Sequence, residues 1–396
     1  MFFVLFACTK KDLDVVIKQE KINVIYQQNN LTASTRFQSI AYDTTEIPKE
    51  RFKVVHISDA HLSAYSVDNH YTNPNNLIES VRFANQPELR VNAMLSTGDN
   101  ISNSYHMMAN ESMLSFYEHL YKDNTIPTYS CYGNHDSNMP YSDDLSAVLQ
   151  RSELFEHMRR NMQINEIYYY KDLPNPMGGT VRIISLNMLD QAGTEFRVIT
   201  QSVYSQEQID WLGNVALKEG MTPSHSVIIL NHFPFQRTTE DLATFLCDGG
   251  FVNGWEMVPE IIEAFRLRRK WEKTYKNNNK PEVKPIVASF DFSQAKGEFI
   301  CYLGGHAHVY AHFNVKDFEG ESSILKKQQM ILATNMAPSD KGKVFNKVER
   351  VDSTTSSNAF NLYAIDTNVR KIYITFFGAY IPQGETNYPA IQVLDY

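Results

Sequence analysis

The stretch Ile126-Pro127-Thr128-Tyr129-Ser130-Cys131-Tyr132-Gly133-Asn134-His135-Asp136 contains an apolar and aromatic run that ends at Gly133. Such a run predicts a buried strand that stops at the edge of a sheet, with polar residues directly after it. Open α/β sheets bind their ligands at the carboxyl ends of the strands. We therefore expect Asn134, His135 and Asp136 to line a functional site.

Four other apolar runs end in the same way, each followed by Asp or His. They are residues 54–58 before Asp59 and His61, residues 93–97 before Asp99, residues 227–231 before His232, and residues 299–303 before His306 and His308. In chain order, helical periodicity at residues 77–84 lies between the runs at 54–58 and 93–97, and helical periodicity at 111–121 lies between the run at 93–97 and the one that ends at Gly133. This alternation is typical of a parallel sheet. The five predicted strands would bring their polar residues to one rim.

The composition is that of a packed globular protein, with 43% hydrophobic and 21% charged residues among 396. The net charge of −8 argues against general nucleic-acid binding, which depends on a basic surface. Four cysteines are few for a disulfide framework, and Cys131 and Cys301 lie in predicted strands, where cysteine usually acts as a small hydrophobic residue.

The order Asp-x-His, Gly-Asp, Gly-Asn-His-Asp, His and Gly-His-x-His, between Asp59 and His308, resembles the calcineurin-like metallophosphoesterases. The resemblance implies an α/β fold, a four-layer α-β-β-α sandwich of two mixed sheets flanked by helices. It also implies a dinuclear centre of divalent metal ions such as Mn, Fe or Zn. Ser102 stands where purple acid phosphatases carry a tyrosine and where many relatives carry a second carboxylate, so an iron-tyrosinate centre is not expected.

The same resemblance assigns roles to individual residues. The first metal would be held by Asp59, His61, Asp99 and His308, and the second by Asp99, Asn134, His232 and His306, so that Asp99 bridges the two. His135 would contact the phosphate and protonate the leaving oxygen. Asp136 is a candidate for fixing the tautomer of the His135 ring and raising its basicity.

We expect a hydrolase of phosphomonoesters or phosphodiesters that acts on a small phosphate ester through a metal-bound hydroxide, with His135 as general acid. One alternative is a non-catalytic metallophosphoesterase-like scaffold that binds a protein partner, but none of the seven expected ligands is missing. A nuclease of the same family is the other alternative. Such an enzyme would be expected to carry a basic groove, whereas this chain is acidic.

The amino-terminal residues suggest a separate segment. Leu5-Phe6-Ala7-Cys8 resembles the lipobox of a bacterial lipoprotein precursor, which implies an exported protein, periplasmic or at the cell surface, tethered to a membrane through lipidated Cys8. The apolar run before Cys8 lacks a basic region, and a terminus without a targeting role, on a cytoplasmic protein, is the alternative. We expect residues 1–50 to form this leader, a tether and an edge strand at residues 22–26, and residues 51–396 to form the catalytic domain.

Several elements are expected within the catalytic domain. They are a helix at residues 145–162, strands at 167–171 and 181–187, a helix that starts at Ser205 with a Ser205–Gln208 capping box, and strands at 329–334, 359–366 and 369–376 that complete the second sheet. Residues 236–298 interrupt the pattern and contain a predicted basic helix at 259–275. We expect this insertion to lie over the active site and contact substrate, with a surface elaboration as the alternative.

Overall fold

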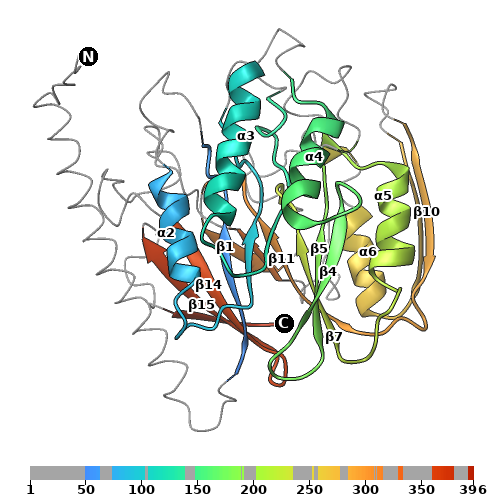
Figure 1. The fold of residues 1–396 in the computed structure, drawn as a ribbon. Helices are drawn as coiled ribbons and strands as arrows, with labels where there is room; N and C mark the ends of the chain where they lie inside the picture. Colours follow the sequence, from blue (N-terminus) through green and yellow to red (C-terminus); the bar gives the residue numbers. More distant parts are fainter. Residues whose placement is uncertain are drawn as a thin grey trace, which may run out of the picture.

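The computed structural model in Figure 1 describes most of the chain from Glu50 onward. The described residues are 50–62, 74–102, 106–138, 148–188, 190, 202–234, 252–253, 257–276, 284–306, 308, 310–314, 329–332, 359–378 and 391–396. The expected leader at Cys8, the tether and the strand at 22–26 lie outside these residues. None of the described helices is long and apolar enough to cross a membrane.

The first sheet has six strands in the order β16-β15-β14-β1-β2-β3. Their bounds are β1 Phe52–Ile57, β2 Ala93–Ser96, β3 Thr128–Ser130, β14 Ala359–Asp366, β15 Lys371–Gly378 and β16 Ile391–Asp395. β1, β2 and β3 are parallel, whereas β14 pairs antiparallel with β1, and β15 and β16 extend the sheet in antiparallel pairing. All six residues of β1 are buried, as expected for a parallel strand covered on both faces.

The second sheet also has six strands, in the order β12-β13-β11-β7-β5-β4. Their bounds are β4 Tyr169–Pro174, β5 Thr180–Ser185, β7 His225–Leu230, β11 Glu298–Gly304, β12 Ala311–Asn314 and β13 Gln329–Leu332. The edge strands β4 and β12 pair antiparallel with their neighbours, and the four strands between them are parallel. The α/β class with two mixed sheets is therefore confirmed.

One expectation about the carboxyl-terminal strands was wrong. Only β13 joins the second sheet, whereas β14 and β15 belong to the first, where Phe52 of β1 is paired with Ile365 of β14. The reason is that β14 covers the free edge of β1. Without this pairing, β1 would expose a row of unpaired backbone groups.

Helices accompany both sheets. They are α2 Asn75–Ala84, α3 His106–Tyr121, α4 Arg151–Met162, α5 Gln206–Trp211, the π-helix η3 Leu212–Ala216 and α6 Met257–Arg266. The described residues also include two short pairs of strands, β6 Ser202–Val203 with β8 Val252–Asn253, and β9 Lys270–Tyr275 with β10 Ile286–Asp291. Figure 1 shows α2 and α3 beside the first sheet, and α5 and α6 on the side of the second.

Three predicted helices differ from the structure in detail. α4 begins at Arg151, where Glu153 accepts a hydrogen bond from the Gln150 backbone. Ser205 caps α5, but the Gln208 side chain bonds to the Asn187 backbone and not back to Ser205. The basic helix predicted at 259–275 was wrong beyond Arg266, because residues 270–275 pair with β10 as a strand.

One apolar cluster shows how the two sheets are placed. Phe52 and Val54 of β1 belong to a cluster that also contains Ile228 of β7 and Ile300 of β11, so this face of the first sheet packs against the second sheet. Successive side chains of a strand point to opposite faces. His56 therefore shares the face of Val54, between the two sheets.

The insertion is described only in part. α6 packs on β9 and β11, and β10 packs on α5, so residues 257–276 and 284–298 build onto the second sheet. Of residues 235–256, only 252–253 are described. The expectation that the insertion covers the active site stays a prediction.

Candidate metal centre

Five strand ends from both sheets meet at one rim, which is formed by the residues that follow β1, β2, β3, β7 and β11. Backbone hydrogen bonds join the loops there. Asp59 N–H donates to Gly98 O (3.0 Å), and Gly305 N–H donates to His232 O (2.9 Å). Loops that are far apart in the sequence are thus held in contact by their backbones, and their side chains converge.

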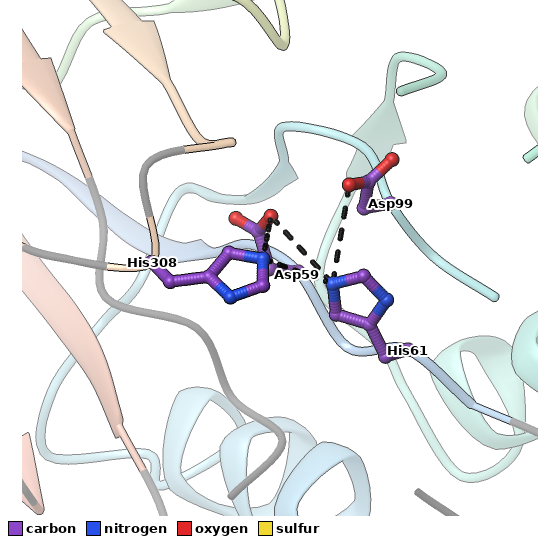
Figure 2. Close-up of side chains that lie close together, drawn as sticks. All are labelled: Asp59, His61, Asp99 and His308. Atoms are coloured by element: carbon purple, nitrogen blue, oxygen red, sulfur yellow. Dashed lines mark hydrogen bonds and ion pairs between the residues drawn. The ribbon is translucent and has the colours of Figure 1, made fainter. Parts of the chain in front are cut away.

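Asp59, His61, Asp99 and His308 form the first cluster at this rim (Figure 2), with one ligand atom of each within 4.8 Å of all the others. His308 Nε2 lies 3.2 Å from Asp59 Oδ1, and His61 Nε2 lies 3.9 Å from both Asp59 Oδ1 and Asp99 Oδ2. The Nε2 atoms of His61 and His308 are only 3.1 Å apart. Two imidazole nitrogens directed at the same point, beside two carboxylates, are a donor set that fits a divalent cation.

A second cluster contains Asp99, His232 and His306, and Asn134 lies beside it. His232 Nε2 is 3.1 Å from Asp99 Oδ2 and 3.1 Å from Asn134 Oδ1, which is also 3.1 Å from His306 Nδ1. The other ring nitrogen of His232, Nδ1, is 2.7 Å from the backbone oxygen of Thr97 and donates to it. This bond fixes the proton on Nδ1 and directs Nε2 at the cluster, the orientation that metal ligation requires.

Asp99 belongs to both clusters, so the rim has the arrangement of two adjacent cation sites with a shared carboxylate. Burial alone would raise the pKa of Asp99, but the His232 and His135 rings outweigh it and hold the pKa well below its usual value. Burial lowers the pKa of His61 and of His306 to about 3. Metal ligands have to be ionised carboxylates and neutral imidazoles, and Asp99, His61 and His306 are in those states near neutral pH. Burial alone would lower the pKa of His232 and of His308, but Asp99 raises the first to about 9 and Asp59 raises the second, so a cation has to displace a proton from His232.

Comparison with known proteins agrees with this geometry. The sequence profile described as calcineurin-like phosphoesterase matches residues 52–310, a range that contains both clusters. The chain belongs to this family. Two solved structures are similar to this phosphoesterase at low sequence identity.

The first is a dimetal phosphatase from Danio rerio, with 13% identity and a TM-score of 0.49, over 83% of this chain and 96% of that one. The second is PhoD, with 11% identity and a TM-score of 0.44, over 87% of this chain and 68% of that one. No curated protein matches the chain.

The backbone of the phosphoesterase is unusual at the proposed ligands. Among the described residues, eleven that are not glycine have a positive φ, and five of these are proposed ligands: Asp59 (51°), His61 (45°), Asp99 (48°), His306 (68°) and His308 (55°). Residues with side chains pay a steric cost in this region, and such strain concentrates at functional sites. The backbone at the strand ends therefore directs the side chains of the proposed ligands toward one another, at some cost in stability.

Gly133 and Gly305 allow the loops at the rim to approach each other closely. A Cβ on Gly133 would lie 2.2 Å from Asp99 Oδ1, and a Cβ on Gly305 would lie 2.0 Å from Ser58 Oγ. The Cβ on Gly133 would also lie 2.5 Å from the Asp99 backbone nitrogen, so only glycine fits there, whereas a Cβ on Gly305 would displace the Ser58 hydroxyl. Gly-Asn-His-Asp and Gly-His-x-His thus need their glycine for the approach of one loop to the next.

His135 lies at the rim but outside both clusters. Its backbone N–H donates to Asp99 Oδ1 (2.9 Å), its ring meets the His61 ring edge-on with centroids 4.6 Å apart, and its side chain is 17% exposed. The ring is thus beside the first cluster and still reachable from solvent. A ligand bound at the clusters could contact it.

The hydrogen bonds of the Asp136 carboxylate go to groups other than the His135 ring, so its expected action on that ring stays a prediction. Oδ1 accepts from the backbone N–H groups of Asn100 (2.8 Å) and Ile101 (3.0 Å), and Oδ2 accepts from Gly133 N–H (2.7 Å) and Asn100 Nδ2 (3.0 Å). The carboxylate is fully buried. It joins the loop that carries Asp99 to the loop that carries Asn134.

Sequence reasoning missed the residues that support the ligands. Ser58, Thr97 and Asn100 are buried and bond to Asp59, His232 and Asp136 respectively. Ser58 and Asn100 directly flank a proposed ligand in the sequence, and Thr97 lies two residues before Asp99. A polar residue at the end of an apolar run, next to a ligand, was the available signal.

Proposed function

We propose that this phosphoesterase hydrolyses small phosphate esters, monoesters or diesters, with the help of two divalent metal ions at the rim. The observation that carries the proposal is the sharing of Asp99 by two clusters of ligand atoms. In such a site, a pair of cations neutralises phosphoryl oxygens and lowers the pKa of a bound water. Donors that mix carboxylate, imidazole and amide oxygen suit Mn, Fe or Zn.

The residues divide into those that would hold the cations and one that would act on the ester. The first cluster would hold one cation, and the second cluster together with Asn134 would hold the other. The two cations would fix the position of the phosphoryl group. His135 would bind the phosphate and donate a proton from its ring to the leaving oxygen. Its partial exposure beside the buried His61 supports this role, because a substrate can reach it without displacing a ligand.

Hydrolysis of p-nitrophenyl phosphate and bis-p-nitrophenyl phosphate, measured side by side, tests the proposal. Metal-free protein would be resupplied with Mn²⁺, Zn²⁺, Fe²⁺ or Mg²⁺, with Asp99→Asn as the inactive variant and Asp123→Asn, at an exposed turn, as the matched control. We expect metal-dependent turnover that Asp99→Asn abolishes, and the ratio of the two rates identifies the ester class. Absence of turnover with every metal would favour the non-catalytic scaffold.

A nuclease assay on single-stranded and double-stranded DNA, under the same metal conditions, tests the remaining alternative. We expect little cleavage, because the chain carries a net charge of −8. Cleavage of DNA faster than of either nitrophenyl ester would contradict the choice of a small substrate.

We also propose a membrane tether through Cys8, supported by the resemblance of Leu5-Phe6-Ala7-Cys8 to a lipobox. Labelling with a palmitate analogue during expression in a bacterial host, compared with Cys8→Ser, tests this proposal. Equal labelling of the two proteins, or no labelling of either, would contradict it.

A further inference from the structure

Behind Asp59, a chain of polar side chains runs into the space between the two sheets. We call these five residues the Asp59 relay: Ser58, Thr97, His56, Tyr363 and Asn361. Each is at most 3% exposed. His56 and Tyr363 come from the paired strands β1 and β14, and the apolar cluster around them includes Val54 and Ile365. Burial of polar groups in such surroundings is costly unless every group is paired, so the relay is not explained by packing alone.

The hydrogen bonds of the relay form one unbroken series that ends on Asp59. Ser58 Oγ is 2.5 Å from Asp59 Oδ2, and Thr97 Oγ1 is 2.9 Å from Ser58 Oγ. His56 Nε2 is 2.9 Å from Thr97 Oγ1, and His56 Nδ1 is 2.8 Å from the Tyr363 hydroxyl. Asn361 Nδ2 lies 3.1 Å from the same hydroxyl and completes the series.

The charge of Asp59 fixes the direction of every bond in this series. A carboxylate only accepts, and each hydroxyl has one hydrogen to donate. Ser58 therefore donates to Asp59, Thr97 donates to Ser58, and Thr97 Oγ1 has to accept from His56 Nε2–H. Burial lowers the pKa of His56 to about 3, so the ring is neutral and its Nδ1 accepts from Tyr363. All the donors thus point toward Asp59, and each bond polarises the next.

The last bond of the series separates the two oxygens of Asp59. Oδ2 is occupied by the Ser58 hydroxyl, whereas Oδ1 faces the ring nitrogens of His308 at 3.2 Å and His61 at 3.9 Å. The His306 backbone N–H lies 3.2 Å from both oxygens, so the Ser58 bond is what distinguishes them and leaves Oδ1 directed into the first cluster. The second cluster does not depend on these side chains, because Thr97 holds His232 through its backbone oxygen.

We propose that the Asp59 relay is a positioning device that holds Asp59 as a one-oxygen ligand and raises the affinity of the first cluster for its cation. The proposal rests on the metal-dependent function proposed above. Partners of this kind typically change metal affinity by roughly 10- to 100-fold when they are removed. Because the relay contacts Asp59 alone among the ligands through its side chains, the effect should be confined to one of the two sites.

Titration of metal-free protein with Mn²⁺ by isothermal calorimetry, at constant pH, tests the proposal without any assay of activity. Thr97→Val keeps the shape and the backbone oxygen of Thr97 but removes its hydroxyl, and we expect it to weaken one site by about tenfold and to change the other by less than twofold. Thr97→Ser restores the hydroxyl and should restore the affinity. His308→Ala, in the first cluster, and His306→Ala, in the second, show which site is which.

Two further variants separate the relay from a loss of general stability. Tyr363→Phe removes the hydroxyl that is farther from the metal, and it should weaken the same site by a smaller factor. Tyr169→Phe is the matched control, because its buried hydroxyl donates to Ser130 O and lies outside the relay. Tyr363→Phe loses the bonds to His56 and Asn361, and Tyr169→Phe loses those to Ser130 O and Met162 Sδ, so both urea midpoints should fall while only Tyr363→Phe changes metal binding.

The outcomes distinguish the two proposals. If the unaltered protein binds fewer than two Mn²⁺ ions, the proposed function fails. If it binds two, and Thr97→Val and Tyr363→Phe leave both sites unchanged or weaken both equally, the positioning role is refuted and the function stands. Tyr363→Phe gives this answer even where Thr97→Val does not fold.

Discussion

Replacement of Asp136 by asparagine tests whether this residue joins two loops or serves His135. The two carboxylate oxygens accept four N–H groups within 3.0 Å, from Asn100, Ile101 and Gly133. Asparagine would put an NH₂ group in place of one oxygen, so two buried donors would lose their acceptors and face another donor. Each buried, unpaired donor costs about 1–3 kcal/mol, which gives a loss of about 4 kcal/mol in the free energy of unfolding.

Urea denaturation of the metal-free protein measures this loss directly. Asp123→Asn is the control, because Asp123 is exposed at φ 58° and asparagine tolerates this left-handed conformation. We expect the control to change the free energy of unfolding by less than about 0.5 kcal/mol. A loss below about 1 kcal/mol in Asp136→Asn, together with a large fall in kcat, would refute the joining role and return Asp136 to the role of a partner for His135.

The remaining predictions concern the metal site and the helix α4. Mn²⁺ at 100 times its Kd should raise the free energy of unfolding by about 2.7 kcal/mol for each site, and Asp99→Asn should remove most of this gain in a urea titration. Gly133→Ala should abolish tight Mn²⁺ binding in calorimetry, since its Cβ would lie 2.2 Å from Asp99 Oδ1, whereas Gly178→Ala, with nothing within 4 Å, should bind normally. Burial and then Arg160 lower the pKa of His157 to about 4. The contribution of neutral His157 to stability is therefore fully present above the unfolded pKa of 6.5 and is lost as the pH falls toward 4. Between pH 7 and 4.5, the free energy of unfolding in urea titrations should fall by about 1–2 kcal/mol more in the unaltered protein than in His157→Gln.

The strands and the residues after them could be predicted because a buried parallel strand has a strong local pattern. β1, β2, β7 and β11 are runs of apolar residues, and each ends within three residues of an Asp or a His. The carboxyl ends of parallel strands have to meet at one edge, so local sequence was enough to gather the ligands. The order of the motifs then identified the set as a whole.

Strand partners and short amphipathic segments could not be read in the same way. Residues 270–275 combine three charged residues with Trp271, Thr274 and Tyr275, and after an apolar helix such a segment is easily taken for its continuation. The segment becomes a strand only because β10 pairs with it and Phe290 stacks on Trp271 with ring centroids 5.9 Å apart. The relay was hidden for the same reason, since His56 and Tyr363 are 307 residues apart.

The left-handed backbone at the rim explains why support beneath the ligands matters as much as the ligands themselves. Asp59 and His61 both adopt a positive φ, and each such residue costs about 1–2 kcal/mol. Backbone bonds from Asp59 N–H to Gly98 O and from His61 N–H to Asp99 O, both 3.0 Å, hold this conformation against its strain. They fix the two Cα positions, and the His306 backbone N–H, 3.2 Å from both oxygens of Asp59, holds the carboxylate without selecting one oxygen. The Ser58 bond to Oδ2, from a series anchored in the core, makes that selection before a cation arrives, so the cost of ordering the ligand is met by folding and not by binding.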